Sequence, residues 1–369
     1  MKNINTILIS QFPLPFHKIG SWTTLYNNYI TSSYNLIDII ICEAPQKNIY
    51  QNVDYQFIEK TFRTKLVKRI TKQTKYEYLK AFTQVIEPNK KYIIQIIDNF
   101  GLASQLIDYL KNKKIKQNFY IQFFYHGHAP FFGNTVEARF FNENIDEYIL
   151  LTKLSYLEHI SYYSSLATRF NILHNGVDTN KFYKLDTIAK SELKRSLGVE
   201  NKKIFIWCSQ DKPKKGLFLI LDAWKRFSSN NPDCELWIIG TNKKENTESI
   251  KYFGKVHNDD LPKYFQVADV FLFSTLCQEG FGLALIEAKH CGCYCIASAL
   301  GGVPEVLEFG KYGKLIEMSH LIDSWVTAMQ EFIDNPIAFD TLPLDKYSSD
   351  TWNKQMANII NQAKINFVE

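Results

Sequence analysis

Short apolar runs alternate with longer helical segments along nearly the whole chain, and this alternation constrains the fold more than any other feature. The runs are apolar at consecutive positions, so both faces of each strand must be buried. Strands of this kind, separated by helices, form parallel sheets that are covered on both sides. We therefore predict an α/β protein built from doubly wound, Rossmann-like parallel-sheet domains.

The expected elements fall into two successive sets, and a chain of 369 residues is too long for one ordinary core, which predicts two domains. We expect strands at 4–10, 36–42, 92–97, 119–125, 147–151, 170–174, 203–208, 235–239, 269–274, 293–297 and 312–316. We expect helices at 101–111, 216–227, 258–268, 283–292 and 319–335.

The expected domain boundary lies at HNGVD, residues 174–178, because Asn-Gly interrupts the pattern and a polar stretch follows. The first domain is then 1–174 and the second 175–349. Residues 350–369 form a separate amphipathic helix, with a return to the first domain as one option.

The cysteines and the hydropathy point to a cytoplasmic protein. Seven cysteines are scattered without a framework, as expected for free thiols in a reducing compartment. The opening run INTILIS is too short for a secretory signal and is interpreted as a first strand. No apolar run has the length of a membrane-spanning helix.

Residues 57–82 concentrate positive charge in a chain whose net charge is +5, with eight basic and two acidic side chains. Phe62, Leu66 and Ile70 recur there at helical spacing, so we interpret the segment as a basic amphipathic helix. Its basic face is either an ordinary solvated surface or a surface for anionic membrane lipids, which attract such clusters.

The segment QEGFGLALIEA, residues 278–288, follows a predicted strand and opens a predicted helix. Gly280 and Gly282 allow a ligand close to the backbone, and amides at a helix start favour an anion. Glu279 would repel a bare phosphate, so we expect it to contact a neutral, hydroxyl-rich part of the same ligand. A sugar joined to a diphosphate satisfies both demands.

Glu279 and Glu287 resemble the E-x7-E element of retaining glycosyltransferases with the GT-B fold, family 4. Four further segments resemble the family in the same order: NGVDTNKF, KKGLFLILDAW, LPKYFQVADVFLFST and EAKHCGCYCIASALGGVPEVL. The resemblance is close over about 170–317. It implies two Rossmann-like domains facing across a cleft, the first binding acceptor and the second binding nucleotide sugar.

The resemblance also implies a role for each matching residue. Glu287 would bind the ribose hydroxyls, Glu279 the hydroxyls of the transferred sugar, and Lys215 the diphosphate. The other positions expected to contact the donor are Gly20, Ser21, Gln210, Val256, Gly280, Phe281, Gly282 and Leu283. His126, after a buried strand, matches the histidine that borders the transferred sugar.

Gln210 departs from the family, which usually has arginine there. Glutamine can donate a hydrogen bond to phosphate but has no charge, so one cation is lost from the leaving-group site. Lys212 and Lys214 lie close in sequence and could compensate; lower activity and a different donor are the other outcomes.

Several residues also fit metal sites. His126 and His128 share one face of an extended chain, but no third or fourth ligand follows, and a structural histidine is a further alternative. Cys291, Cys293 and Cys295 lack the paired spacing of zinc sites and are interpreted as buried core thiols. Asp259-Asp260 fits a helix cap, so we expect no metal requirement.

These inferences favour a metal-independent retaining glycosyltransferase with no cofactor, which moves a sugar from a nucleotide diphosphate to a glycan or lipid-linked acceptor. UDP-sugars are favoured over GDP-sugars by default, and cell-surface polysaccharide assembly is the expected setting. A nucleotide-sugar epimerase and a non-catalytic glycan- or nucleotide-binding subunit are the alternatives. No feature of the chain suggests a nucleic-acid partner.

Overall fold

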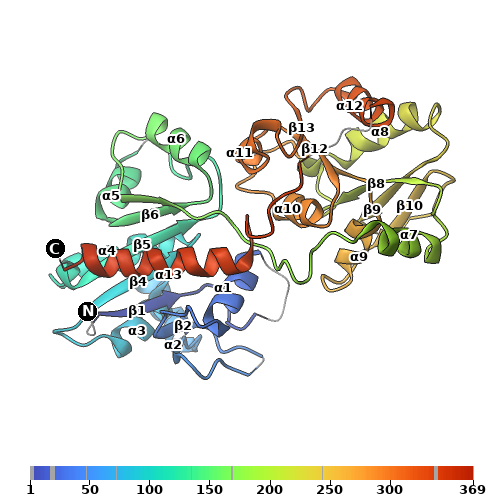
Figure 1. Ribbon diagram of the computed structural model, residues 1–369. Coiled ribbons are helices and arrows are strands. Elements are labelled where there is room, and N and C mark those ends of the chain that lie inside the picture. The colour runs from blue at the N-terminus through green and yellow to red at the C-terminus, as the bar shows by residue number, and fades with distance from the viewer. Residues whose placement is uncertain are drawn as a thin grey trace. The chain divides into compact units, whose positions relative to one another are not determined.

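The computed structural model describes residues 4–16, 21–46, 48–71, 73–133, 135–167, 169–242, 244–335 and 340–368. The chain forms two units, of which the first comprises Met1–Asn175 and Ser349–Glu369 and the second Gly176–Ser348 (Figure 1). The chain enters the second unit after Asn175 and leaves it after Ser348, so the last helix belongs to the first unit.

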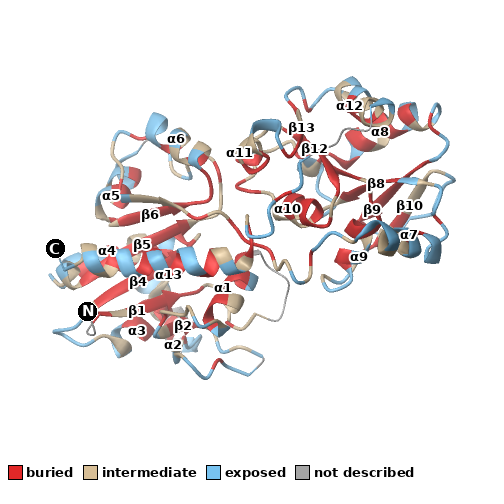
Figure 2. Ribbon diagram, in the orientation of Figure 1, coloured by how far each residue is buried: buried red, intermediate tan, exposed pale blue. Residues whose placement is uncertain are grey.

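The first unit contains a parallel sheet in the order β3-β2-β1-β4-β5-β6-β7. Its strands are β1 (Ile4–Ile9), β2 (Ile39–Cys42), β3 (Asp54–Phe57), β4 (Lys91–Ile97), β5 (Phe119–Tyr125), β6 (Glu147–Leu150) and β7 (Arg169–Ile172). The central strands are buried along their length, as Figure 2 shows, which explains their continuous apolar sequences.

Helices cover both faces of this sheet. The helices of this unit are α1 (Ser21–Thr31), α2 (Phe62–Thr71), α3 (Tyr76–Val85), α4 (Phe100–Asn112), α5 (Val136–Asn144), α6 (Lys153–Tyr162) and α13 (Ser349–Asn366). One face packs against α3, α4 and α5, and the other against α1 and α13. Trp352 of α13 contacts the rings of Tyr26 and Tyr29, which anchors the last helix to this unit.

The second unit contains a parallel sheet in the order β10-β9-β8-β11-β12-β13. Its strands are β8 (Lys203–Cys208), β9 (Cys234–Ile239), β10 (Ile250–Gly254), β11 (Val270–Phe273), β12 (Tyr294–Ser298) and β13 (Gly313–Ile316). Its helices are α7 (Thr187–Ser196), α8 (Leu217–Ser228), α9 (Leu261–Val267), α10 (Leu283–His290), α11 (Val303–Val306) and α12 (Ile322–Asp334). Helices α8 and α12 cover one face (Figure 1).

The prediction of two doubly wound parallel-sheet units is confirmed, and each expected apolar run coincides with a strand. Two described strands were not predicted, β3 and β10, and both lie at a sheet edge. Edge strands are paired on one side only and are less buried, so their sequences DYQF and IKYFG lack a continuous apolar pattern.

The prediction of one basic helix over 57–82 is wrong. Phe57 ends β3, and two helices follow, α2 and α3. Helix α3 buries Tyr78, Leu79 and Phe82 in the core, so its apolar side serves the fold. The basic residues continue from α2 through Lys75 to Lys80 of α3, so the charge pattern does not mark where one helix ends and the next begins.

Each sheet reverses its direction of growth beside its first strand. In the second unit, the chain adds β9 and β10 on one side of β8 and then places β11 on the other. Ligands of open parallel sheets bind beyond the carboxyl ends of the strands at this switch point. The loops after β8 and β11 meet there, and they contain half of the predicted site residues.

Candidate active site

The loop after β11 leads into α10, as the sequence predicts. Gly282 precedes the helix with a φ of 88°, in the left-handed region. A Cβ atom at Gly282 would lie 3.2 Å from the Phe273 ring, so a side chain is disfavoured by both conformation and space. Phe281 and Gly280 are buried, whereas Leu283 is partly exposed at the helix start.

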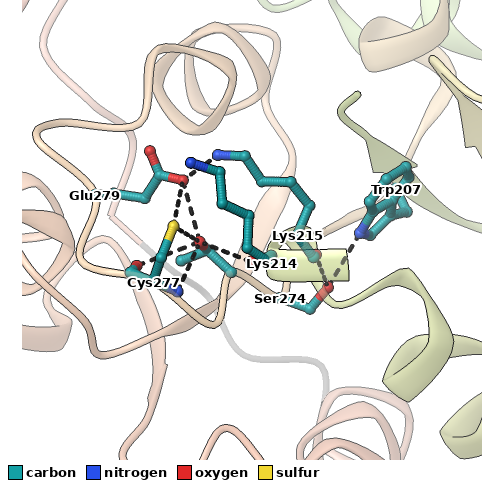
Figure 3. A network of polar contacts seen from close by, with 7 residues as sticks. Trp207, Lys214, Lys215, Ser274, Cys277 and Glu279 are labelled. Carbon is teal, nitrogen blue, oxygen red and sulfur yellow. Dashed lines mark hydrogen bonds and ion pairs between the residues drawn. The ribbon is translucent and has the colours of Figure 1, made fainter. Parts of the chain in front are cut away.

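Glu279 forms an ion pair with Lys215, which belongs to the loop after β8 (Figure 3). Their side chains are only 17% and 20% exposed, so the pair is largely withdrawn from water. The Thr275 hydroxyl donates a hydrogen bond of 3.1 Å to the same carboxylate, and the Cys277 sulfur lies 3.9 Å from it. Two of the predicted catalytic residues therefore contact each other.

The turn that carries Lys215 is bound tightly to the end of β11. Residues Pro213–Lys215 form one 3-10 turn, and Gly216 follows with a φ of 69°. A Cβ atom at Gly216 would lie 2.0 Å from the Ser274 carbonyl oxygen, so only glycine fits. The amide of Leu276 donates to the Lys214 carbonyl at 2.8 Å and joins the two loops.

The backbone of Glu279 is held from its other side by the loop after β12. The amide of Gly302 donates to the Glu279 carbonyl at 2.8 Å, and Gly301 pairs with Glu279 as an isolated bridge. Gly301 has a φ of 65°, and a Cβ atom there would lie 2.4 Å from the Glu279 carbonyl oxygen. Gly301 and Gly302 therefore position the backbone of Glu279. In the sequence these two glycines stand out only as part of the segment EAKHCGCYCIASALGGVPEVL.

Glu287 lies on α10 and is partly buried. Burial raises the pKa of its carboxyl to about 7, and the positive charge of Lys181 only partly opposes this. Within the described part of the chain no side chain or amide donates a hydrogen bond to this carboxylate. A buried carboxyl without a protein donor is suited to accept hydrogen bonds from ligand hydroxyl groups.

Gln210 and Val256 lie in the loops after β8 and β10. The Gln210 side chain is exposed and follows the carboxyl end of β8, next to the turn with Lys215. Val256 is partly exposed. Gln210, Val256 and Glu279 therefore all lie beyond the carboxyl ends of strands of the second sheet.

His126 directly follows β5 in the first unit, and Asp98 fixes its orientation. One carboxylate oxygen of Asp98 accepts from the His126 amide at 2.8 Å, and the other lies 3.0 Å from its Nδ1. Asp98 has a φ of 49°, an uncommon value for a non-glycine residue. Sequence reasoning missed Asp98, although its place directly after β4 was a usable signal.

The second histidine of this segment, His128, is buried, and its Nε2 lies 2.9 Å from a carboxylate oxygen of Glu158. The two histidines thus have separate carboxylate partners. Across the described residues no group of three or more His, Cys, Asp or Glu side chains could hold a metal ion.

The remaining predicted residues are placed only in part. Gly20 lies outside the described residues, and Ser21 is the first residue of α1, with its side chain also outside the description. Cys291, Cys293 and Cys295 are buried, and burial raises the pKa of the Cys295 thiol to about 12. The interpretation of these cysteines as core thiols agrees with this burial.

A family model matches most of the second unit. Residues 189–349 match the model described as glycosyl transferases group 1. The matched residues include the segments KKGLFLILDAW, LPKYFQVADVFLFST and EAKHCGCYCIASALGGVPEVL, which resemble glycosyltransferases in sequence. The match covers both loops that form the Lys215–Glu279 pair.

Curated proteins named as glycosyltransferases are similar to part of the chain. The chain is 28% identical over 184 residues to a GDP-mannose-dependent monoacylated alpha-(1-6)-phosphatidylinositol monomannoside mannosyltransferase of Corynebacterium glutamicum, covering 46% of the chain and 48% of the relative. It is 28% identical over 183 residues to a UDP-Gal:alpha-D-GlcNAc-diphosphoundecaprenol alpha-1,3-galactosyltransferase of Escherichia coli, covering 46% of each. The chain thus matches about half the length of these relatives.

Solved structures match the whole fold. HepE of Anabaena, crystallised with UDP and glucose, aligns with a TM-score of 0.67 and 16% identity over 98% of this chain and 100% of its own. The two-unit architecture is therefore that of the GT-B fold.

Among the described residues, no helix combines the length and the apolar character needed to cross a membrane.

Proposed function

We propose that the chain is a metal-independent retaining glycosyltransferase that moves a hexose from a nucleotide-diphosphate donor to a glycan or lipid-linked acceptor. The observation that carries the proposal is the pairing of Glu279 with Lys215 at the switch point of the second sheet. A carboxylate and an ammonium group in contact there can bind the two chemically different halves of one donor, the sugar hydroxyls and the diphosphate.

In the proposed reaction, the bond between the anomeric carbon and the diphosphate oxygen breaks, and a bond to the acceptor oxygen forms on the same face. The acceptor proton passes to the departing diphosphate, so no protein nucleophile is needed. Lys215 and the amides at the start of α10 stabilise the negative charge that develops on the diphosphate. These groups supply positive charge without a metal ion, and Glu279 orients the sugar.

Glu287 is assigned to the ribose of the donor. It is the fifth residue of α10 and follows Glu279 by eight positions, and its carboxylate has no hydrogen-bond donor among the described residues. The two adjacent hydroxyls of a ribose would provide the missing donors. Glu279 precedes α10 and Glu287 lies within it, which suits one ligand whose charged middle faces the helix start.

The donor is proposed to be a UDP-sugar rather than a GDP-sugar. HepE was crystallised with UDP and glucose, and the Escherichia coli relative is named for UDP-Gal. The Corynebacterium relative is named for GDP-mannose, so GDP is the alternative to be tested.

The acceptor is proposed to be glycan or lipid-linked, with the enzyme acting in cell-surface glycan assembly on the cytoplasmic face of a membrane. Helix α2 supports peripheral binding because Phe62 and Ile70 are 81% and 72% exposed beside Arg69. Exposed apolar side chains next to basic residues suit an anionic lipid surface. Part of the charge is already used within the unit, since Lys68 pairs with Glu77 and Lys80 with Glu59.

The test combines binding with turnover in the full chain. UDP and GDP are compared for the rise in melting temperature, since the preferred nucleotide stabilises the folded state more. A panel of UDP- and GDP-hexoses is then incubated with the protein without acceptor. Slow donor hydrolysis supports the proposal, inversion at C2 indicates an epimerase, and binding without turnover indicates a non-catalytic subunit.

A further inference from the structure

Two buried hydroxyl side chains follow β11 directly, and each binds one partner of the Lys215–Glu279 pair. The Ser274 hydroxyl donates to the Lys215 carbonyl at 2.9 Å (Figure 3). The Thr275 hydroxyl donates to Glu279 Oε1 at 3.1 Å. Both residues are only 1% exposed. Adjacent positions at the end of one strand thus hold the two charged residues separately.

The Thr275 hydroxyl has one proton, and its geometry assigns that proton to Glu279. The neutral carbonyl oxygens of Cys277 and Lys214 lie farther away, at 3.3 and 3.5 Å. A charged acceptor also makes the stronger hydrogen bond. The hydroxyl in turn accepts from the Cys277 amide at 3.4 Å, which fixes its direction.

The contacts of the Glu279 carboxylate are one-sided. Lys215, Thr275 and Cys277 all approach Oε1, whereas no described residue binds Oε2. The protein therefore anchors one oxygen and leaves the other to accept hydrogen bonds from a ligand hydroxyl. A carboxylate held in this way is already oriented before the ligand arrives.

The arrangement becomes important when a diphosphate binds. A diphosphate carries more negative charge than a carboxylate, so it competes with Glu279 for the Lys215 ammonium. Once Lys215 turns to the diphosphate, the Thr275 hydroxyl remains on Oε1 at 3.1 Å as the stronger donor, beside the weakly donating Cys277 thiol at 3.9 Å. Glu279 then keeps its orientation toward the sugar.

Ser274 acts on the other partner. The indole Nε1 of Trp207 donates to the Ser274 hydroxyl at 3.0 Å, so this hydroxyl must direct its own proton to the Lys215 carbonyl. The contact fixes the 3-10 turn from which the Lys215 side chain extends.

We propose that Thr275 and Ser274 are positioning residues that divide donor recognition between them: Thr275 orients Glu279 for the sugar, and Ser274 orients Lys215 for the diphosphate. This inference rests on the proposed glycosyltransferase function. It predicts that two adjacent substitutions affect different kinetic parameters, which a purely structural role of the strand end would not produce.

The experiment uses full-length Thr275→Val, Thr275→Ser and Ser274→Ala, with the nucleotide that stabilises the wild type more, UDP or GDP, and with the matching nucleotide hexose. Thr275→Val should lower kcat of donor hydrolysis about tenfold or more with the Kd of the nucleotide within about twofold, because one hydrogen bond to a charge is lost. Thr275→Ser keeps the hydroxyl and should restore kcat to within about threefold. Ser274→Ala should weaken nucleotide binding about three- to tenfold.

Melting temperatures establish that the variants fold, and Thr275→Ala replaces Thr275→Val if the valine is not accommodated. The division of roles would be overturned if Thr275→Val or Thr275→Ala kept the wild-type kcat. It would also be overturned if the Ser274 and Thr275 variants changed the same parameter, kcat or Kd, by equal amounts. Either result would leave the proposed function intact. A wild-type protein that neither binds UDP or GDP nor hydrolyses any donor would reject the function and this inference together.

Discussion

The ammonium group of Lys215 contacts the carboxylate of Glu279 across 64 positions of sequence, where the loops after β8 and β11 meet. Each partner would bind a different half of the proposed donor. In the free protein they neutralise each other instead, so binding of the donor requires this pair to exchange its partners. The first prediction follows from that exchange.

Glu279→Gln should tighten the binding of UDP while it stops sugar transfer. Glutamine has the shape of glutamate but no charge, so it releases Lys215 for the diphosphate and removes a repulsion. We expect an affinity gain of roughly three- to tenfold, the scale of a partly exposed ion pair. Calorimetric titration with UDP measures it. Lys215→Met is the control and should weaken binding, and weaker binding in Glu279→Gln would contradict the exchange.

Glu287 should make stability depend on pH. Its pKa in the folded protein is about 7, above the value of about 4.3 in an unfolded chain. Between these pH values the folded protein retains a proton on Glu287 that the unfolded chain has lost. The stability that this proton gives to the folded state is therefore fully present at low pH and is lost as the pH rises through 7. Glu287→Gln cannot ionise, so its free energy of unfolding relative to the wild type should be higher at pH 8 than at pH 5, by about 1–3 kcal/mol. Urea unfolding at both pH values tests this, and a constant difference would refute it.

The ribose assignment of Glu287 predicts a selective loss. The wild type should bind UDP more tightly than 2′-deoxy-UDP, by roughly five- to twentyfold, because one hydrogen bond to the carboxylate is absent. Glu287→Ala should weaken UDP binding and remove this preference. Titration of both nucleotides into both proteins forms a complete cycle. If the preference persists in Glu287→Ala, another residue binds the ribose.

Gly301→Ala should disturb Glu279 without touching a ligand. Its Cβ atom would lie 2.4 Å from the Glu279 carbonyl oxygen, so the acidic residue must move. Gly198→Ala is the matched control, because its φ of 67° resembles the 65° of Gly301 and no atom lies within 4 Å. The control should cost only about 1 kcal/mol for its conformation. Gly301→Ala should cost more and reduce donor hydrolysis at least about tenfold, a drop that Gly198→Ala should not share.

Helix α2 should contribute to membrane binding through its exposed apolar residues. The double change Phe62→Ser and Ile70→Ser should reduce sedimentation with phosphatidylserine-containing vesicles by roughly half or more, because apolar contact with lipid is lost. Val136→Ser is the control, since Val136 is 81% exposed but begins a helix with Glu137 and Glu143. Equal sedimentation of all three proteins would exclude α2 as the contact.

The central strands could be predicted because their cause is local. Residues such as Phe205, Ile206 and Trp207 are apolar in succession, as burial on both faces requires. The edge strands β3 and β10 and the separation of α2 from α3 could not be predicted in this way. Where these elements begin and end depends on which strand or helix packs beside each of them in the folded unit.

The sequence by itself determined the α/β class, the two parallel sheets and the identity of the acidic and basic residues at the candidate site. Only the tertiary structure decided that Lys215 pairs with Glu279, that Thr275 and Ser274 hold them, and that Gly301 supports the backbone. The physical reason is the order of the strands. The pairing of β8 with β11 brings two distant loops to one sheet edge, and no local pattern in either loop encodes that contact.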